Sequence, residues 1–108
     1  MQPVFLESPY AGDVEGNELY LNACLADCLA RNEAPYASHG LYTRPGVLDD
    51  TKPEERSRGL AAGSAIRALF RKTVVYVDRG ISSGMRSGIR ESLSLEHEIE
   101  YRHILESE

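Results

Sequence analysis

Residues 74–85 constrain the fold of this chain more than any other stretch, because they combine the signals of a strand, a turn and a helix start. Residues 74–77 read Val-Val-Tyr-Val, a run of β-branched and aromatic residues that is typical of a short buried strand. Gly80 and Gly84 follow, and glycine adopts backbone angles that other residues resist. The stretch therefore predicts a central strand that leads through a turn into a helix over about residues 85–95.

The turn after this strand has the features of an anion site. Ser82 or Ser83 can cap the helix that follows. The free N–H groups of a helix start, together with its partial positive charge, suit a phosphate or a carboxylate. Asp78, at the carboxyl end of the strand, is placed to hold a ribose hydroxyl or the polar edge of a base. These features indicate a nucleotide-like ligand, but they do not specify a reaction.

Length and charge limit the number of domains and the kinds of partner. A chain of 108 residues with 42% hydrophobic residues can bury one modest core, so we expect a single domain over residues 1–108. The net charge of -5 and the scattered basic residues argue against nucleic acid as the main partner. No apolar run approaches the ~20 residues that cross a bilayer, so we expect a cytoplasmic protein without a membrane partner. A sheet of about four strands leaves apolar surface incompletely covered at this size, which favours a homo-oligomer.

The two cysteines, Cys24 and Cys28, are expected to be buried apolar side chains. They lie one helical turn apart and share a helix face with Leu21 and Leu25. Without a nearby histidine or a second cysteine pair, two thiols do not complete a zinc site. We therefore predict no metal and no cofactor.

Strand and helix signals alternate along the chain. Asp13 can cap a first helix, and residues 51–54, Thr-Lys-Pro-Glu, have the form of a capping box. The expected elements are strands near residues 4–6, 34–39, 74–77 and 98–104 and helices over about residues 14–30, 51–70 and 85–95. This alternation predicts a single small three-layer α/β (Rossmann-like) domain with right-handed crossovers. Its mostly parallel sheet would have about four strands in the order 2-1-3-4. Glu98, Glu100 and Arg102 alternate along the last strand and are expected on its solvent face.

Candidate site residues follow from this topology. In such a sheet, ligands bind beyond the carboxyl ends of the strands, where the strand order changes direction, which here is between the first and third strands. His39, near the end of the second strand and beside the long loop over residues 40–50, is placed to face this crevice. The candidate ligand-binding residues are Ser8, Pro9, Tyr10, Gly12, His39, Asp78, Gly80, Ser82, Ser83, Gly84 and Met85.

Each candidate also has a structural interpretation. A carboxylate that ends a strand, such as Asp78, often caps a turn, and Ser82 and Ser83 are good helix caps whatever the function. Tyr10 either stacks on a base or packs in the interior, and His39 is either a ligand contact or a structural histidine. The sequence leaves open whether Arg56, Arg86 and Arg90 face the pocket.

Several motifs occur in an order that resembles a known group of proteins. They are Glu7-Ser-Pro-Tyr-Ala-Gly-Asp13, Ala37-Ser-His39 with Tyr42-Thr43, Leu48-Asp-Asp50, Pro53-Glu-Glu-Arg56, and Asp78-x-Gly-Ile-Ser-x-Gly-Met85 followed by Gly88-Ile89. Together they resemble small, mostly phage-encoded and largely uncharacterised proteins of the nucleoside 2-deoxyribosyltransferase-like superfamily. The resemblance implies a flavodoxin-like sheet that binds nucleosides or nucleotides at the switch point and often completes its site across a subunit interface.

The chain departs from this superfamily at the position of its nucleophile. Deoxyribosyltransferases carry a nucleophilic glutamate on the helix after the third strand, and the position that corresponds to it here is Gly88. Glu91 lies three residues further on, about 60° around the helix, and is poorly placed to replace it. The resemblance therefore implies the pocket without the chemistry.

Three classes of function remain. The first is a non-catalytic binder that sequesters a nucleotide-derived molecule, for example a cyclic or modified ADP-ribose immune signal, as a phage anti-defence sponge in the host cytoplasm. The second is an N-glycosidase or deoxyribosyltransferase-like enzyme with Glu7, Asp78 or Glu91 as nucleophile or acid. The third is an interaction module for a host protein. We favour the binder, because a glycine stands where the nucleophile is expected.

Overall fold

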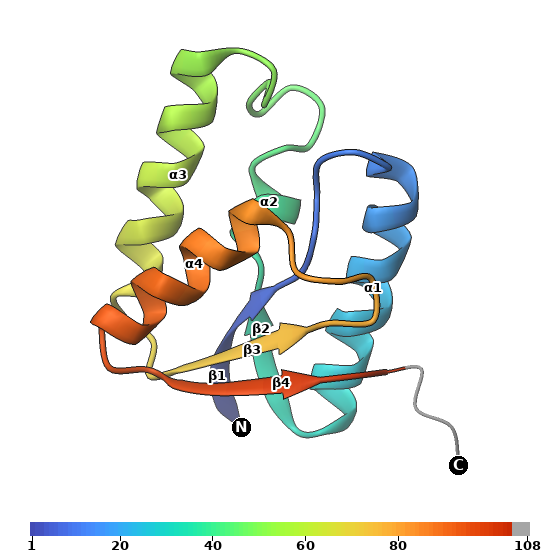
Figure 1. Cartoon of the computed structure of the whole chain (residues 1–108), viewed down its shortest axis with the longest axis vertical. Coiled ribbons are helices and arrows are strands. Elements are labelled where there is room, and N and C mark those ends of the chain that lie inside the picture. Colours follow the sequence, from blue (N-terminus) through green and yellow to red (C-terminus); the bar gives the residue numbers. More distant parts are fainter. Residues whose placement is uncertain (105–108) are drawn as a thin grey trace.

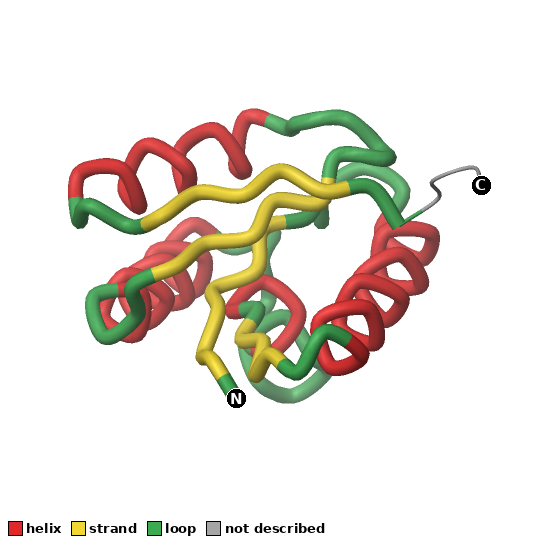
Figure 2. Tube along the Cα trace, turned by 90° about the horizontal axis from the view of Figure 1, so that it is seen from below, coloured by secondary structure: helices red, strands yellow, loops and turns green. Residues whose placement is uncertain are grey.

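The computed structural model describes residues 1–104 and confirms the predicted α/β fold. Its sheet has four strands, all parallel, in the order β2-β1-β3-β4. The elements, in chain order, are β1 (Gln2–Glu7), α1 (Val14–Ala30), β2 (Glu33–Tyr36), α2 (Ser38–Leu41), α3 (Pro53–Arg67), β3 (Lys72–Tyr76), α4 (Ser83–Ser94) and β4 (Glu98–Arg102). Figures 1 and 2 show α1 on one side of the sheet and α4 on the other.

Side chains alternate across β1 and so divide the interior into two layers. Val4 and Leu6 pack towards α1 in the larger apolar cluster, which also contains Cys24 and Cys28. Both cysteines are fully buried free thiols, and burial raises the pKa of Cys24 to about 12. Phe5, between Val4 and Leu6 in the chain, faces the opposite way and meets Phe70 edge to face at 5.5 Å. The next residue on that second face is a charged one, Glu7.

The second strand is shorter than the sequence predicts. It ends at Tyr36, and residues 38–41 form a short helix, α2, so the expected strand over residues 34–39 is wrong at its end. A helix of four residues shows no hydrophobic period, which is why the sequence gives no sign of it. As a result, His39 lies on a helix that packs against α3.

The start of α3 also differs from the prediction. Its N-cap residue is Lys52, which makes no side-chain cap hydrogen bond, so the expected capping box of residues 51–54 is wrong. The Thr51 hydroxyl instead donates to Asp49 Oδ1 at 2.6 Å and closes the preceding loop. Pro53 occupies the first turn as expected, because its missing N–H is not needed there.

The last strand is not a simple solvent-facing edge. Arg102 is only 5% exposed, and its guanidinium lies against Glu33 from the start of β2. The prediction that Arg102 is exposed is therefore wrong. Its buried charge is compensated by the ion pair with Glu33. Separately, no helix within residues 1–104 is both long and apolar enough to cross a membrane.

Candidate functional site

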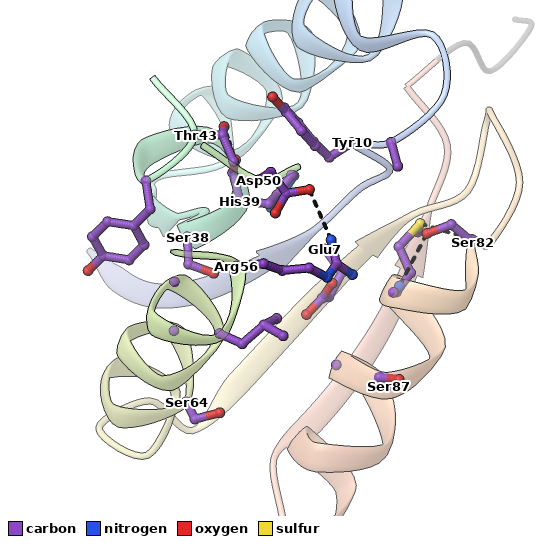
Figure 3. Close-up of a pocket in the computed structure, with 18 of the residues that line it drawn as sticks. Glu7, Tyr10, Ser38, His39, Thr43, Asp50, Arg56, Ser64, Ser82 and Ser87 are labelled. Carbon is purple, nitrogen blue, oxygen red and sulfur yellow. Dashed lines mark hydrogen bonds and ion pairs between the residues drawn. The ribbon is translucent and has the colours of Figure 1, made fainter. Parts of the chain in front are cut away.

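A cavity of about 410 Å³ opens at the carboxyl end of β1, beside the point where the strand order changes direction. Its walls come from the segment after β1, from α2, from the loop before α3, from α3 itself and from the start of α4. Figure 3 shows Tyr10, His39, Arg56 and Ser82 arranged around Glu7. Segments that are far apart in the sequence therefore meet here, as the predicted topology requires.

Glu7 and Arg67 form a buried ion pair at the wall of this cavity. Alternation along β1 directs Glu7 to the same face as Phe5, and Arg67 ends α3. The two residues are 7% and 6% exposed, and Arg67 Nη2 donates to Glu7 Oε2 at 2.6 Å. Burial raises the pKa of the Glu7 carboxyl above its usual value, and the Arg67 charge opposes that rise.

Gly88 makes room for this ion pair. It lies on the buried face of α4, directly against the Glu7 carboxylate. A Cβ at Gly88 would lie 2.7 Å from Glu7 Cδ and 2.9 Å from Arg67 Nη2, closer than such atoms approach. Gly88 on α4 thus faces a carboxylate that comes from β1.

A buried chain of hydrogen bonds fixes the Arg67 guanidinium. Arg67 Nη1 donates to Ser92 Oγ at 2.7 Å, and Ser92 Oγ lies 2.7 Å from Thr73 Oγ1. Thr73 Oγ1 in turn lies 2.9 Å from His97 Nδ1. Arg67 donates the first of these hydrogen bonds, and each hydroxyl further along can either donate or accept, so the chain connects Arg67 to His97 through Ser92 and Thr73. Burial lowers the pKa of His97, which favours its neutral ring.

Arg67 has further partners on its other sides. Its guanidinium carbon stacks 4.1 Å above the Phe5 ring. Glu91 approaches Arg67 Nε at 3.4 Å and lines the cavity, although its side chain is about one-third exposed. Arg67 is therefore held by α4, β1 and the aromatic layer together, so its charge has a fixed position beside Glu7.

His39 lines the cavity as a neutral hydrogen-bonding group. Its Nε2 lies 2.8 Å from the Ser8 hydroxyl, which joins α2 to the end of β1. Burial, assisted by the Arg67 charge, lowers the pKa of His39 to about 4. The imidazole is therefore uncharged at neutral pH and does not act as a cationic acid there.

The start of α4 forms another wall, as the sequence predicts. The Ser82 hydroxyl accepts a hydrogen bond from Met85 N at 3.2 Å and caps the helix. Ser82, Ser83, Gly84 and Met85 all line the cavity, and Tyr10 lines it from the β1 side. Tyr10 and Ser83 therefore border the same open space.

The three arginines left open by the sequence have different positions. Arg56 lines the cavity, and its Nη1 donates to Asp50 at 2.9 Å across the rim. Figure 3 shows this contact close to Glu7. Arg86 and Arg90 are exposed on α4 and do not line the cavity.

Some predicted site residues lie elsewhere. Asp78 does not line this cavity, and its Oδ1 accepts hydrogen bonds from the Tyr20 hydroxyl at 2.6 Å and from Ile104 N at 3.1 Å. Alternation explains its position, because Val74 and Tyr76 also face α1. The remaining predicted residues outside this cavity are Pro9, Gly12, which borders an adjoining hollow, and Gly80, which turns the chain at φ 86°.

Arg67 is the main site residue that the sequence reasoning missed. The signal was present, because Gly59, Gly63 and Arg67 follow one another at four-residue spacing and share one face of α3. At Gly63, a Cβ would lie 2.9 Å from Ser38 Oγ, so α2 approaches the backbone there. A charged residue one turn beyond two glycines on a helix face indicates a buried contact.

Within residues 1–104, no group of three or more histidine, cysteine, aspartate or glutamate residues is arranged to hold a metal ion. The residues around the cavity offer hydroxyls, carboxylates, two arginines and helix N–H groups. This donor set suits a polar organic ligand that carries hydroxyl groups and an anionic group.

Comparison with solved structures supports the fold. The chain is similar to a 2-deoxyribosyltransferase from the psychrotolerant bacterium Bacillus psychrosaccharolyticus, described as a biocatalyst for the synthesis of antiviral and antitumoral nucleosides. The TM-score is 0.66, and the similarity covers 94% of this chain and 72% of that one. The sequence identity is 13%, so the similarity establishes the shared fold alone.

Sequence comparison assigns the family. No curated protein matches this chain. A family model described as "Domain of unknown function (DUF7768)" matches residues 2–102, which span every strand and helix above. The chain belongs to this DUF7768 family.

Proposed function

We propose that the cavity binds a nucleotide-derived small molecule and holds it without cutting it. The observation that carries this proposal is the position of the cavity, at the switch point of a parallel sheet and beside the start of α4. Ligands of nucleotide type bind at this place in related topologies, with an anionic group at the helix start. The fold shared with a 2-deoxyribosyltransferase supports the same class of ligand.

The lining suggests how such a ligand lies. Ser83 and Gly84, in the first turn of α4, offer N–H donors to an anionic group. Tyr10 offers a ring for a base, and the polar groups of Glu7 and His39 lie where a sugar would join the two. This order matches a nucleoside that carries one anionic group.

The charge of the lining limits the number of anionic groups. The carboxylates around the cavity are those of Glu7, Asp50, Glu55 and Glu91, and they outnumber the guanidinium groups of Arg56 and Arg67. Each of these arginines already pairs with a carboxylate. The site therefore favours a ligand of low negative charge, because extra phosphates would meet carboxylates.

The same contacts support binding without turnover. Arg67 donates to Oε2 of Glu7, and this contact makes that oxygen a weaker nucleophile, although burial raises the pKa of the carboxyl overall. His39 is neutral at neutral pH, so it does not supply a proton to a leaving base as an imidazolium. We propose further that the protein sequesters a nucleotide-derived immune signal, as a sponge would, and that the charge of the lining favours a signal with one anionic group over a diphosphate such as an ADP-ribose derivative.

A second candidate function rests on Glu7 itself. A carboxylate with a raised pKa in such a cavity is a candidate acid or nucleophile for cleavage of an N-glycosidic bond. Glu91 also lines the cavity, whereas Asp78 does not. An enzyme of this kind would use a carboxylate from β1 in place of one from α4.

One experiment separates these candidates. The protein is titrated by calorimetry with nucleosides, nucleoside monophosphates, NAD-like dinucleotides and cyclic ADP-ribose, and bound material is released by heat and identified by mass spectrometry. Intact recovered ligand supports sequestration, and a released base supports the enzyme. No binding heat with any of these compounds contradicts the proposal.

A matched pair of tyrosine variants controls this experiment. Tyr10→Ala removes a ring from the cavity wall, whereas Tyr101→Ala removes one from the exposed outer side of β4, where Tyr101 is 56% exposed. We expect weaker binding only for Tyr10→Ala, because stacking contributes about 1–3 kcal/mol per base. Equal effects of both substitutions would contradict the placement of the base.

We also propose that the protein self-associates and covers the apolar side chains exposed on and just after α3. Leu60, which borders the cavity, is 61% exposed, and Leu69 beyond the end of the helix is 78% exposed. A second copy that covers them would remove apolar surface from water. Light scattering on the purified protein tests this, and a monomer at all accessible concentrations would contradict it.

A further inference from the structure

Gly88 has no side chain, and this leaves the space in the cavity wall that the Glu7 carboxylate occupies. Any side chain at position 88 would displace the Glu7 carboxyl group or the Arg67 guanidinium. Both charged groups are nine-tenths buried, and both line the cavity. Arrangements of this kind are unfavourable for stability unless the polar groups are satisfied.

The Glu7 carboxylate is only partly satisfied by the protein. Arg67 donates to Oε2, and no residue in the range 1–104 donates a hydrogen bond to Oε1. An ionised carboxylate has about four acceptor positions, so most of them remain for groups in the cavity. A ligand that fills the cavity and excludes water must supply donors there, because an unsatisfied buried acceptor is costly.

The Glu7 carboxylate accepts hydrogen bonds, so it favours a ligand group that donates them. A phosphate or a base carbonyl only accepts hydrogen bonds and is repelled or ignored by a carboxylate. Two neighbouring hydroxyls offer two donors to the two oxygens of one carboxylate, and acidic residues bind ribose hydroxyls in this way in other nucleotide sites. A ribose with free 2′ and 3′ hydroxyls offers this pair of donors whatever the base, whereas among the common bases only guanine offers a comparable pair of N–H donors.

We propose that Glu7 binds the 2′ and 3′ hydroxyls of a ribose, and that the site selects ribonucleotides over 2′-deoxyribonucleotides. This inference rests on the proposed function. Glu7 acts here as a residue that determines specificity, and Arg67 acts as a positioning residue that orients it. The bonds from Arg67 to Ser92, and from there to Thr73 and His97, keep that orientation fixed.

The test compares ligands that differ by one hydroxyl. Each of the four common ribonucleoside 5′-monophosphates is titrated beside its 2′-deoxy counterpart, with calorimetry for tight binding and NMR shift perturbation for weak binding. We expect the ribose form to bind about 10- to 100-fold more tightly, the range for a hydrogen bond to a charged group. If both forms bind equally, the inference about Glu7 is overturned while the proposed function stands. If neither form binds, the proposed function and this inference both fail.

Substitutions at Glu7 and Gly88 test whether Glu7 causes the preference for ribose over 2′-deoxyribose. Glu7→Gln keeps the shape of the side chain but replaces one acceptor oxygen with a donor, so we expect the ribose preference to fall below about threefold. Gly88→Ala keeps every charge but displaces the carboxylate, and we expect the same loss of preference. Glu18→Gln makes the same chemical change on the exposed side of α1 and should keep the wild-type preference.

Circular dichroism confirms that each variant is folded before the titrations. A folded Glu7→Gln that retains the full ribose preference would overturn the assignment. If Glu7→Gln does not fold, Gly88→Ala provides the same comparison with the Glu7 side chain intact. Retention of the full preference by a folded Gly88→Ala would overturn the assignment equally.

Discussion

Two buried arginine–glutamate pairs, one on each side of the sheet, use the same chemistry to different ends. On the α1 side, Arg102 donates to both oxygens of Glu33, at 2.8 and 2.6 Å. It also donates to Glu100 at 2.8 Å and to the Tyr76 hydroxyl at 3.1 Å. On the other side, Arg67 makes one short contact to Glu7, and its Nε has no hydrogen-bond partner within residues 1–104.

The two pairs differ in how many carboxylate oxygens the arginine occupies, and this number separates a structural ion pair from a pair that faces a ligand. The bidentate contact between Arg102 and Glu33 uses both carboxylate oxygens and links β4 to β2 across the sheet. The contact between Arg67 and Glu7 leaves acceptor positions directed at a cavity of about 410 Å³. We therefore propose that the first pair contributes mainly to stability and the second to recognition.

The largest expected effect comes from breaking the Arg102 pair. Arg102→Ala leaves Glu33 buried without its partner, and we expect the free energy of unfolding to fall by about 3–5 kcal/mol. Urea denaturation followed by circular dichroism measures this change. A loss below about 1 kcal/mol would show that the pair on the α1 side is not structural.

Gly88→Ala should have the next largest effect, on the pair that faces the cavity. The added methyl collides with the Glu7 carboxylate, and we expect a loss of about 1–3 kcal/mol from overpacking. In a Glu7→Ala background the collision with the carboxylate is gone, so the same substitution should be less destabilising. A double-mutant cycle by urea denaturation measures the coupling, and additive effects would argue against this contact.

Two carboxylates beside the two arginines, Glu100 next to Arg102 and Glu7 next to Arg67, should respond to pH in opposite directions. The pKa of Glu100, beside Arg102 and Lys72, is lowered to about 2, so its contribution to stability is present above pH 4.5 and is lost as the pH falls towards 2. The pKa of Glu7 is raised above 4.5, so its contribution declines as the pH rises from 4.5 through the folded-state value.

Unfolding free energies measured against pH check this contrast. Relative to the wild type, Glu100→Gln should be least destabilising at low pH. Glu7→Gln should become relatively more favourable as the pH rises above 4.5. A Glu7→Gln curve with the opposite slope would show that the Arg67 charge outweighs burial.

The smallest expected effect is the protonation of His39 at low pH, which should leave the fold unchanged. The pKa of His39 is lowered to about 4, so its ring resonances in NMR should move with a midpoint near that pH. A midpoint near 6.5 would mean that His39 is open to solvent and that the wall formed with Ser8 is not closed.

The fold was predictable from local signals, and the site only in part. The buried run in β3 and the alternation of helix and strand were enough to predict a parallel sheet of about four strands. The alternation does not fix the strand order, and the predicted order 2-1-3-4 is that of the flavodoxin-like fold implied by the resemblance. The cap at Ser82 was also predictable, because serine at a helix start follows from local hydrogen bonding. The short helix α2 was not, because four residues show no period.

The site contacts depend on tertiary positions that no local pattern contains. Glu7 and Gly88 come from opposite ends of the chain and meet only when α4 packs on the sheet. The position of Asp78 was predictable, because Asp78 continues the alternation of Val74 and Tyr76 towards α1. The glycine turn beside it instead favoured a ligand contact.

An NMR titration with adenosine 5′-monophosphate shows on which side of the sheet a ligand binds. We expect chemical-shift changes at the amides of Ser83, Gly84 and Gly88 around the cavity, while the amides of Cys28 and Glu33 on the α1 side stay unchanged. Shifts confined to the α1 side, or no shifts at millimolar ligand, would contradict the assignment of recognition to the Arg67 side of the sheet.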